Sequence, residues 1–475
     1  MKINHNMSAT ITNAQLLRTE NNLSDSMERL SSGLKINHAK DDPSGMAISN
    51  KISAQIDGLD MASQNAQNGQ SLLEIADGAL GETTSIIQRM RELAVQAASD
   101  TSTPSDKKAI QAEIDQLLEE VNRISRDTEY NTKTLLDGTS DVRVYSEYAE
   151  RIYTSDAVEP ATYTITVNSA SEPATYSTSA TTFSGTIDST QTGTISINGV
   201  EASIEEGDTA EEVFEKIREA AELAGVEVTN YGTDTTTYNG LELATEDAGA
   251  DVGLTIAIDN DTLATLLGFD GLTDGTVTNY GSTGEVSIHD TGSNFSSTAT
   301  ANVDGYKVTV TDSKGFELSF KLSDECLEEI TNNGSAEVTL DVTDIGTMTL
   351  QIGANEHQTI DVRIPEVTTT SLYIDDINVV KLEGGGEAIS KLDDALARVN
   401  SIRSKIGAYE NRLDYASESL SQTSEDMTAA LSRIADVDMA KEMTEYTKYT
   451  VLDQSAISVL TQANELPQTV LSLLQ

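Results

Sequence analysis

The side chains best suited to catalysis or metal binding are few in this sequence and lie far apart. The 475 residues include one cysteine and four histidines, namely Cys326, His5, His38, His289 and His357. No two of them have the short spacing of a zinc site. The sequence also lacks the glycine-rich phosphate-binding motifs and the nucleophile elbow of serine hydrolases. We therefore expect no enzyme activity, no metal site and no cofactor.

Two local features still invite a chemical interpretation. The triplet Gly384–Gly386 has the composition of a phosphate loop, but it directly precedes a segment that we expect to be helical from about Ala388. A flexible joint is the better interpretation. Cys326 lies beside Glu325, and a neighbouring negative charge does not lower the pKa of a thiol. We interpret this cysteine as structural or incidental.

Charge and composition exclude several classes of protein. There are 78 acidic residues against 30 basic ones, a formal net charge of −48. The chain therefore lacks the basic face needed to bind nucleic acid or an anionic membrane. With 37% hydrophobic residues and no tryptophan, an elongated molecule with thin cores or a large assembly interface is expected rather than one thick core. No stretch is long and apolar enough to span a bilayer.

Secondary-structure elements must position the residues just described. In the N-terminal third of the chain, the sequence pattern predicts helices. One apolar series recurs every seven residues: Leu59, Ala66, Leu73, Leu80, Ile87 and Ala94. A second seam lies between Leu72 and Ala97, and the pattern resumes after Pro104 at Ile110, Ile114, Leu117, Val121 and Ile124. Two seams predict a helix with more than one neighbour. Pro104 predicts a turn between antiparallel helices.

The C-terminal part repeats the pattern. Its series are Leu392, Val399, Ile406, Leu413, Leu420, Met427 and Ile434, and then Tyr449, Leu452, Ala456, Val459, Ala463, Leu466, Val470 and Leu473. Any one stripe could cover an internal core, but stripes at both ends favour contacts with each other and with other copies. The predicted subunit-packing residues are Leu59, Leu73, Leu80, Ile87, Leu413, Leu420, Leu452, Val459, Leu466, Val470 and Leu473.

The middle of the chain is acidic and predicts strands. Residues 141–370 carry about 41 acidic and about 8 basic side chains, so this surface stays solvated and repels its own copies. Alternating runs predict strands at 163–167, 194–197, 307–310 and 316–320. At about 191–271, a turn at Asn198-Gly199 and a capping box at Thr209–Glu212 predict a compact α+β module. The fold class is α+β.

Several motifs, in this order along the chain, resemble those of bacterial flagellin. They are LSSGLKIN at 30–37, AKDD at 39–42, IQRMRELAVQ at 87–96, IQAEI at 110–114, QIGAN at 351–355, SIRSKIGA at 401–408, NRL at 411–413, QAN at 462–464 and PQ with VLSLL at 467–474. The resemblance covers about 1–140 and 345–475. The module at about 191–271 is similar to an insertion of many flagellins and hook-associated proteins.

The resemblance implies a domain plan. Residues 1–43 with 435–475 would form a terminal coiled-coil domain that lines an inner tube. Residues 44–140 with 345–434 would form a helical rod with a short β part. Residues 141–344 would form a variable, β-rich outer region that includes the small α+β module. The N- and C-terminal helices would thus pair as a coiled coil and helical rod.

The resemblance also implies a function. The chain would be a structural subunit that polymerises into the flagellar filament for swimming motility. It would lie outside the cell, exported through the type III channel without a cleaved signal peptide. Its partners would be other copies, an export chaperone, the filament cap and hook-associated proteins, with no nucleic acid and no membrane. The alternative is a hook–filament junction protein, which shares the terminal regions but is present in few copies.

In flagellins, a patch on the rod helices is recognised by Toll-like receptor 5. The matching positions here are Arg89, Leu93 and Glu113, and they are the hypothetical receptor-binding residues. The alternative is that all three serve subunit packing. A cysteine at 326 is unusual in the family. In the outer region it would allow disulfide-linked filaments under oxidation.

Overall fold

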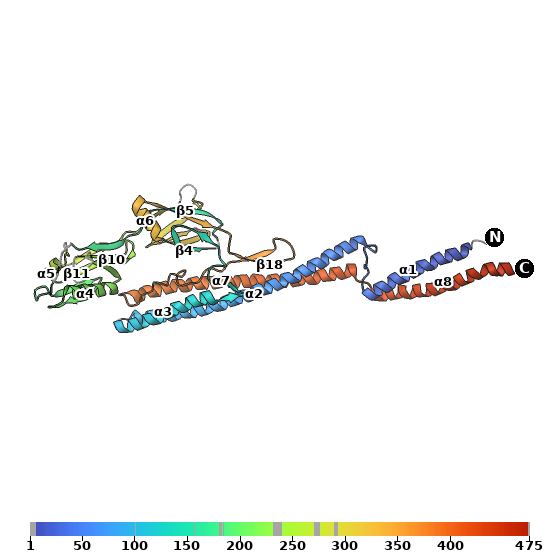
Figure 1. The fold of residues 1–475 in the computed structure, drawn as a ribbon, viewed down its shortest axis with the longest axis horizontal. Helices are drawn as coiled ribbons and strands as arrows, with labels where there is room; N and C mark the ends of the chain where they lie inside the picture. Colours follow the sequence, from blue (N-terminus) through green and yellow to red (C-terminus); the bar gives the residue numbers. More distant parts are fainter. Residues whose placement is uncertain are drawn as a thin grey trace. The chain divides into compact units, whose positions relative to one another are not determined.

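The computed structural model describes residues 6–99, 101–155, 157–179, 183, 185–230, 240–269, 276–288 and 293–473, with only the backbone at 230 and 466–473. Helices lie at both ends of the chain and a β-rich region lies between them (Figure 1), which confirms the predicted α+β class. The chain divides into two compact units. Unit 1 comprises Met1–Gln70, Leu350–Ile360 and Asn411–Gln475, and unit 2 comprises Ser71–Thr349 and Asp361–Glu410.

Among the described residues, the helices are α1 (Met7–Ser32), α2 (Pro43–Ala97), α3 (Pro104–Asp127), α4 (Ala210–Leu223), α5 (Asp261–Leu266), α6 (Asp324–Asn333), α7 (Gly384–Ala435) and α8 (Met439–Leu473). Prolines begin two of these helices, and one of them, Pro104, lies at the predicted turn between helices. Pro43 opens α2, and Pro104 opens α3 after a capping box between Thr103 and Asp106. The apolar seam of α3 passes through Leu118 rather than the predicted Leu117, since Leu118 is the buried one of the two.

In unit 1, α1 and α8 lie antiparallel, and both ends of the pair are tied. The Asn6 side chain donates to the Ala463 carbonyl at 2.7 Å, and Ser26 hydrogen-bonds Glu442 at 2.6 Å. At the opposite end from the termini, α1 stops at Gly33. This residue has φ +74, a left-handed conformation that glycine adopts without strain.

The remainder of unit 1 is built on α2. A hairpin of β18 (Met348–Gln351) and β19 (Thr359–Val362) sends its residues from 350 onward against this helix. A Cβ on Gly58 would lie 2.9 Å from Ala354, and a Cβ on Gly69 would lie 2.6 Å from Leu350. The two glycines therefore let the hairpin approach closely. Between them, the Asn65 amide donates to the Gln351 carbonyl at 3.1 Å.

In unit 2, the second half of α2, all of α3 and the first half of α7 lie side by side (Figure 1). Ion pairs join α2 to α7, with Arg91 to Asp393 at 2.5 Å and Arg403 to Asp77 at 2.8 Å. The predicted heptad positions of these segments are buried, and they are Leu73, Leu80, Ile87, Leu392, Val399 and Ile406. The heptad pattern therefore predicted the buried side of both long helices.

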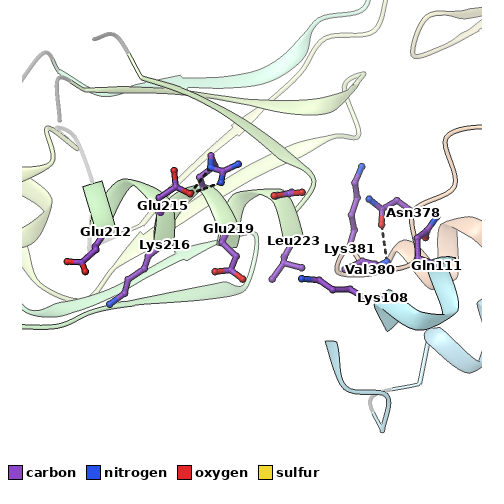
Figure 2. Close-up of a pocket in the computed structure, with 12 residues that line it drawn as sticks. Lys108, Gln111, Glu212, Glu215, Lys216, Glu219, Leu223, Asn378, Val380 and Lys381 are labelled. Atoms are coloured by element: carbon purple, nitrogen blue, oxygen red, sulfur yellow. Dashed lines mark hydrogen bonds and ion pairs between the residues drawn. The ribbon is translucent and has the colours of Figure 1, made fainter. Parts of the chain in front are cut away.

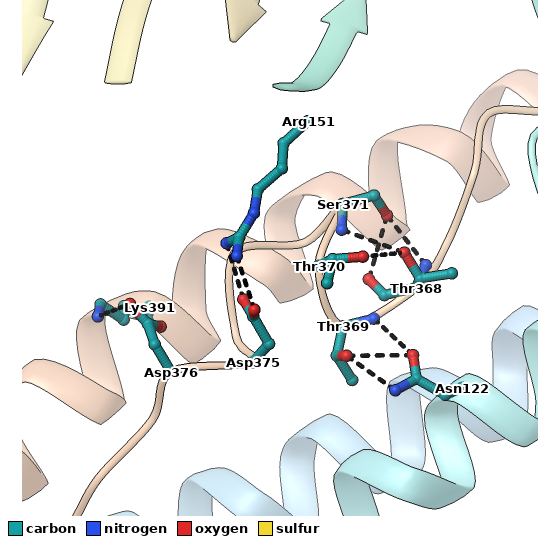
Figure 3. Close-up of polar contacts among 9 residues, drawn as sticks. All are labelled: Asn122, Arg151, Thr368, Thr369, Thr370, Ser371, Asp375, Asp376 and Lys391. Carbon is teal, nitrogen blue, oxygen red and sulfur yellow. Dashed lines mark hydrogen bonds and ion pairs between the residues drawn. The ribbon is translucent and has the colours of Figure 1, made fainter. Parts of the chain in front are cut away.

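The loop before α7 binds three elements together. Asn122 on α3 exchanges hydrogen bonds with Thr369, and Arg151 on β4 donates to both oxygens of Asp375 at 2.9 and 2.8 Å (Figure 3). Lys391 on α7 reaches Asp376 of the same loop at 2.9 Å. This segment therefore attaches the β-rich region to the helices.

The first part of the β-rich region consists of two antiparallel sheets with α6. One sheet has the order β13 (Glu285–Ser287), β5 (Ala161–Ser169), β17 (Ala336–Val342), β3 (Val144–Tyr145). The other has the order β14 (Thr300–Asp304), β15 (Lys307–Thr311), β16 (Glu317–Leu322), β4 (Ala149–Thr154). Their shared core contains Phe320, Ile165 and Cys326. A separate short pair is formed by β1 (Glu129–Tyr130) and β2 (Lys133–Thr134).

The second part contains the predicted module of about 191–271 and extends beyond it at both ends, since β6 (Pro173–Ser177) and β12 (Thr276–Tyr280) belong to its sheets. It has a sheet of order β12, β11 (Gly253–Ile258), β7 (Gly193–Ile197), β8 (Val200–Ile204), and another of order β6, β10 (Leu241–Ala248), β9 (Val226–Asn230). The predicted turn at Asn198-Gly199 is confirmed by positive φ angles of 47 and 89. The predicted capping box of α4 is confirmed as well. Residues 231–239 and 270–271 of the expected range lie outside the described residues.

This second part is inserted into the first. The chain leaves the first body after β5 and returns to it at β13, and the two crossing points touch. Glu172 and Ser282 exchange backbone hydrogen bonds of 2.9 and 3.0 Å. Nearby, a Cβ on Gly284 would lie 2.8 Å from the Ser169 carbonyl oxygen, so the strands cross at backbone distance. The residues between Glu172 and Ser282 therefore form an inserted unit whose two ends lie side by side.

The glycine triplet is not the predicted flexible joint, because Gly384 is the first residue of α7. Gly385 is buried, and a Cβ there would lie 2.7 Å from the Ala98 backbone nitrogen. The triplet therefore provides close packing between the start of α7 and the end of α2. The composition alone could not distinguish a mobile glycine run from one that a neighbouring backbone requires.

Substituting Gly385→Ala should lower the free energy of unfolding by about 1–3 kcal/mol, because the new methyl group meets backbone that cannot move aside. The matched control is Gly386→Ala. This residue is exposed, and its Cβ would have no neighbour within 4 Å, so the change should be neutral or stabilising by up to about 1 kcal/mol. Urea unfolding followed by circular dichroism measures both. Equal effects of the two variants would contradict the packing role.

Candidate assembly surfaces

The contact between α1 and α8 is only partly apolar. The less exposed side chains recur at alternating steps of three and four, and they are Ala9, Thr12, Leu16, Thr19, Leu23, Ser26 and Leu30 on α1, with Glu442, Tyr446, Tyr449, Asp453, Ala456, Leu460 and Ala463 on α8. Glu442 is 9% exposed, and its carboxylate accepts the Ser26 hydrogen bond. The predicted apolar series includes Tyr449, Ala456 and Ala463 of this seam. It does not include the polar positions Glu442 and Asp453.

Asp453 places an unfavourable buried polar group in the same seam. Its Oδ1 atom is buried and has no hydrogen-bond partner. A buried polar atom without a partner costs about 1–3 kcal/mol. The α1–α8 pair is therefore weakly stabilised by its own contacts.

Apolar side chains of the pair remain uncovered beside this seam. The predicted packing residues Leu452 and Val459 are 45% and 51% exposed. They lie next to the contacting positions Asp453 and Leu460 rather than on them. Further exposed apolar side chains are Met7, Ile11, Leu17 and Met27 on α1, with Met439, Met443, Val451 and Ile457 on α8. We call this whole set the uncovered terminal face. The side chains of Leu466, Val470 and Leu473 lie outside the described residues.

The other predicted packing residues are covered within the chain itself. Leu73, Leu80, Ile87 and Leu413 have no exposed surface, and Leu59 and Leu420 are each 8% exposed. Leu59 and Leu420 form a small cluster with Ala62 in unit 1. The folded chain leaves these side chains almost no surface to offer to another copy.

The three hypothetical receptor residues differ in exposure. The Arg89 guanidinium donates to Glu113 at 2.8 Å and to Glu92 at 3.3 Å, and these exposed groups link α2 to α3. The Glu113 carboxylate raises the pKa of Arg89 further above its usual range. Leu93, four residues after Arg89 on α2, is only 3% exposed. Arg89 and Glu113 therefore form the accessible part of this patch.

A pocket of about 530 Å³ lies where the inserted module meets the helices of unit 2. Charged residues of α4, including Glu212, Glu215 and Glu219, line one side, and Lys108 and Gln111 on α3 line the other (Figure 2). Arg218 pairs with Glu215 at 2.6 Å, and Lys216 pairs with Asp208 at 2.7 Å. Several of the charged side chains that line the pocket are engaged in ion pairs, so it has the character of a joint rather than of a reaction site.

The residues considered for catalysis lie apart in the structure. His38 contacts Glu28 at 2.7 Å and His357 contacts Glu356 at 3.4 Å, while His5 and His289 lie outside the described residues. Among the described residues, no group of three His, Cys, Asp or Glu side chains could hold a metal ion. No described helix is long and apolar enough to cross a membrane.

Cys326 has no exposed surface and lies in the core of the first β body. Burial raises the pKa of its thiol to about 11. The expectation that Cys326 would allow disulfide-linked filaments is wrong for the folded chain, because its sulfur is enclosed by the core. Its interpretation as a structural residue agrees with this burial.

Comparison with known proteins decides the family. Residues 3–141 match the bacterial flagellin N-terminal helical region, and residues 389–474 match the bacterial flagellin C-terminal helical region. Over 98% of this chain and 100% of the relative, the sequence is 32% identical to a flagellin of Clostridium tyrobutyricum. It is also 32% identical to a flagellin of Salmonella typhimurium strain LT2, over 100% of this chain and 99% of that protein.

The chain belongs to the bacterial flagellin family. Flagellins are structural proteins, and membership supports a role as a structural subunit of the extracellular flagellar filament, which serves motility. Among solved structures, FliC from Burkholderia pseudomallei is similar at 20% identity, over 72% of this chain and 99% of that one, with a TM-score of 0.24. A likeness at that score carries no argument. The flagellin assignment rests on the sequence relatives.

The thiol of Cys326 should react slowly with Ellman's reagent in the folded chain, at least about a hundredfold more slowly than in urea. Its raised pKa keeps it protonated to about pH 11. The stabilisation from the neutral thiol is therefore complete below the unfolded pKa, near 9, and is lost as pH rises from there through 11. Equal reaction rates with and without urea at pH 8 would show that the sulfur is accessible.

Proposed function

We propose that this chain polymerises into the flagellar filament through the uncovered terminal face. The observation that supports this most directly is the exposure of Leu452 and Val459, at 45% and 51%, beside a polar seam. Apolar area removed from water yields about 25 cal/mol per Å². The weak internal pair therefore has more to gain from neighbouring copies than from its own contacts.

The proposed domain roles follow from this. Residues 1–43 with 435–475 form the inner tube, and residues 44–140 with 345–434 form the rod around it. Residues 141–344 form the outer region, whose acidic surface favours solvent over self-association. Before assembly, the uncovered terminal face needs protection from water. An export chaperone that covers α8 from Leu452 to Leu473 would supply it, and the filament cap and hook-associated proteins would meet the same helices after export.

The close relatives are named flagellins and align over nearly their full lengths, which favours the filament subunit over a hook–filament junction protein. The two roles differ in copy number, so thousands of copies per cell would support the first and a handful the second. Electron microscopy of purified filaments with peptide mass mapping distinguishes them.

Substituting Leu452→Gln and Val459→Gln together should raise the critical concentration for growth on filament seeds at least about tenfold, because each change removes about 1.5–3 kcal/mol of apolar burial. The control is Ser455→Gln, an exposed polar position on the same helix, which should alter growth little. Light scattering and electron microscopy follow the reaction. Normal growth of the double variant would rule out the uncovered terminal face as the polymer contact.

A second candidate function is recognition of the monomer by Toll-like receptor 5. Arg89 and Glu113 are exposed, and their ion pair at 2.8 Å holds both groups in one patch across α2 and α3. We propose that these two side chains make the receptor contact. Leu93, which is buried, would support the helix beneath them. The patch can also serve packing between subunits, since a receptor for monomers can use a polymer surface.

Substituting Arg89→Ala should weaken binding of the monomer to the receptor at least about tenfold, as is typical for an arginine at the centre of an interface. Glu113→Ala should have a similar but smaller effect. The control is Arg91→Ala. Arg91 lies on the same helix as Arg89, and its substitution breaks a comparable ion pair, to Asp393 on α7. Surface plasmon resonance measures the affinities. Equal losses for Arg89→Ala and Arg91→Ala, or no loss for either, would contradict the assignment.

A further inference from the structure

Arg398 on α7 is a partly buried cation without an ion-pair partner among the described residues. Its guanidinium carbon lies 3.8 Å from the centroid of the Tyr153 ring, and burial lowers its pKa. In the part of the chain that the structure describes, no carboxylate lies within ion-pair distance of Arg398 and no acceptor receives its hydrogen bonds. The aromatic ring satisfies one face of the guanidinium but none of its five N–H donors.

Two other arginines of unit 2 form the ion pairs with carboxylates that Arg398 lacks. Arg151 donates to both oxygens of Asp375 at 2.9 and 2.8 Å. Arg403, five residues after Arg398 on α7, pairs with Asp77 at 2.8 Å. A buried guanidinium needs such a partner, because leaving it uncompensated destabilises the folded chain. Among the described residues Arg398 has no such ion pair, although the carboxylates of Glu317 and Asp141 act on its charge from a longer distance.

The space beside Arg398 could hold the missing partner. Arg398 lines a pocket of about 340 Å³, together with Arg151 and the hydroxyl-bearing residues Thr154, Thr370 and Ser371. Figure 3 shows Thr370 and Ser371 on the loop that also carries the partner of Arg151. The pocket thus brings two guanidinium groups and three hydroxyl groups to one cavity. Several of these groups are already engaged within the chain, because Arg151 donates to Asp375, Ser371 Oγ donates to the Glu366 and Thr368 carbonyls, and Thr370 Oγ1 bonds Thr368 Oγ1. The donors that remain for an oxygen ligand are those of Arg398 and the hydroxyl of Thr154, which accepts from Arg363 at 3.2 Å.

We propose that this pocket binds a small oxyanion of the phosphate or sulfate type, with Arg398 as its principal cation. A planar guanidinium fits two oxygens of such an ion at once, and the Thr154 hydroxyl can donate to a further oxygen. The site is separate from both the uncovered terminal face and the Arg89–Glu113 patch. It therefore requires neither polymerisation nor a receptor.

Two carboxylates limit how strongly the pocket binds. Glu150 and Glu366 also line it, and neither lies within ion-pair distance of Arg398. Glu366 accepts a hydrogen bond from Thr368 at 2.8 Å, which keeps it on its own loop. Glu150 is exposed at the edge of β4. Their negative charges repel an anion, so the expected affinity is modest and depends on ionic strength.

Isothermal titration calorimetry of the full-length monomer with sodium phosphate, at constant ionic strength set by sodium chloride, tests the proposal. We expect saturable binding in the millimolar range. Arg398→Gln should weaken it at least about tenfold. The control Arg412→Gln removes an exposed arginine from the same helix and should leave binding within about twofold of the original.

The substitution Glu150→Gln tests for an increase in phosphate affinity and leaves Arg398 in place. Removing this negative charge should strengthen phosphate binding about two- to threefold. The proposal is overturned if the original protein shows no saturable binding, or if Arg398→Gln binds as the original does. Circular dichroism checks that Arg398→Gln is folded. If it is not, the Glu150→Gln result decides, and unchanged or weaker binding overturns the site.

Discussion

Ser26 and Glu442 share a buried hydrogen bond of 2.6 Å although 416 positions separate them in the sequence. Because the first and last helices meet in this way, everything between them must leave the pair and return to it. The antiparallel halves of α2 and α7 are the first consequence, since both continue from that pair. Closing a longer excursion costs little extra entropy once the ends are fixed. The chain can therefore carry a large middle region on a constant helical base.

The polarity of the same contact explains why the terminal helices do not complete their own core. Glu442 and Asp453 occupy positions where a self-sufficient coiled coil would place leucine or isoleucine. The apolar side chains stand next to the seam. In α2 and α7 the arrangement is reversed, because Leu80 and Leu413 are fully buried within the chain. The same heptad pattern thus marks side chains that pack inside the chain and side chains that stay exposed. Only their exposure in the structure distinguishes the two groups.

Local sequence patterns predicted the helices, the small α+β module and the capping box of α4, since these depend on neighbours within a few residues. Thr209 and Glu212 specify their capping box locally, and Gly33 specifies its own turn. Tertiary contacts decided the rest. Gly385 is required by the Ala98 backbone, which the sequence does not place beside it. Arg398 looks like any surface arginine of a heptad, and its burial depends on the β-rich region.

The paired hydrogen bonds between Glu172 and Ser282 have an evolutionary consequence. They hold the entry and exit of the inserted module at backbone distance, so the host sheets do not depend on what lies between. Recombination could replace this cassette with any folded unit whose ends lie equally close together. The surface of the inserted module could then change wholesale while the strands that carry it keep their register.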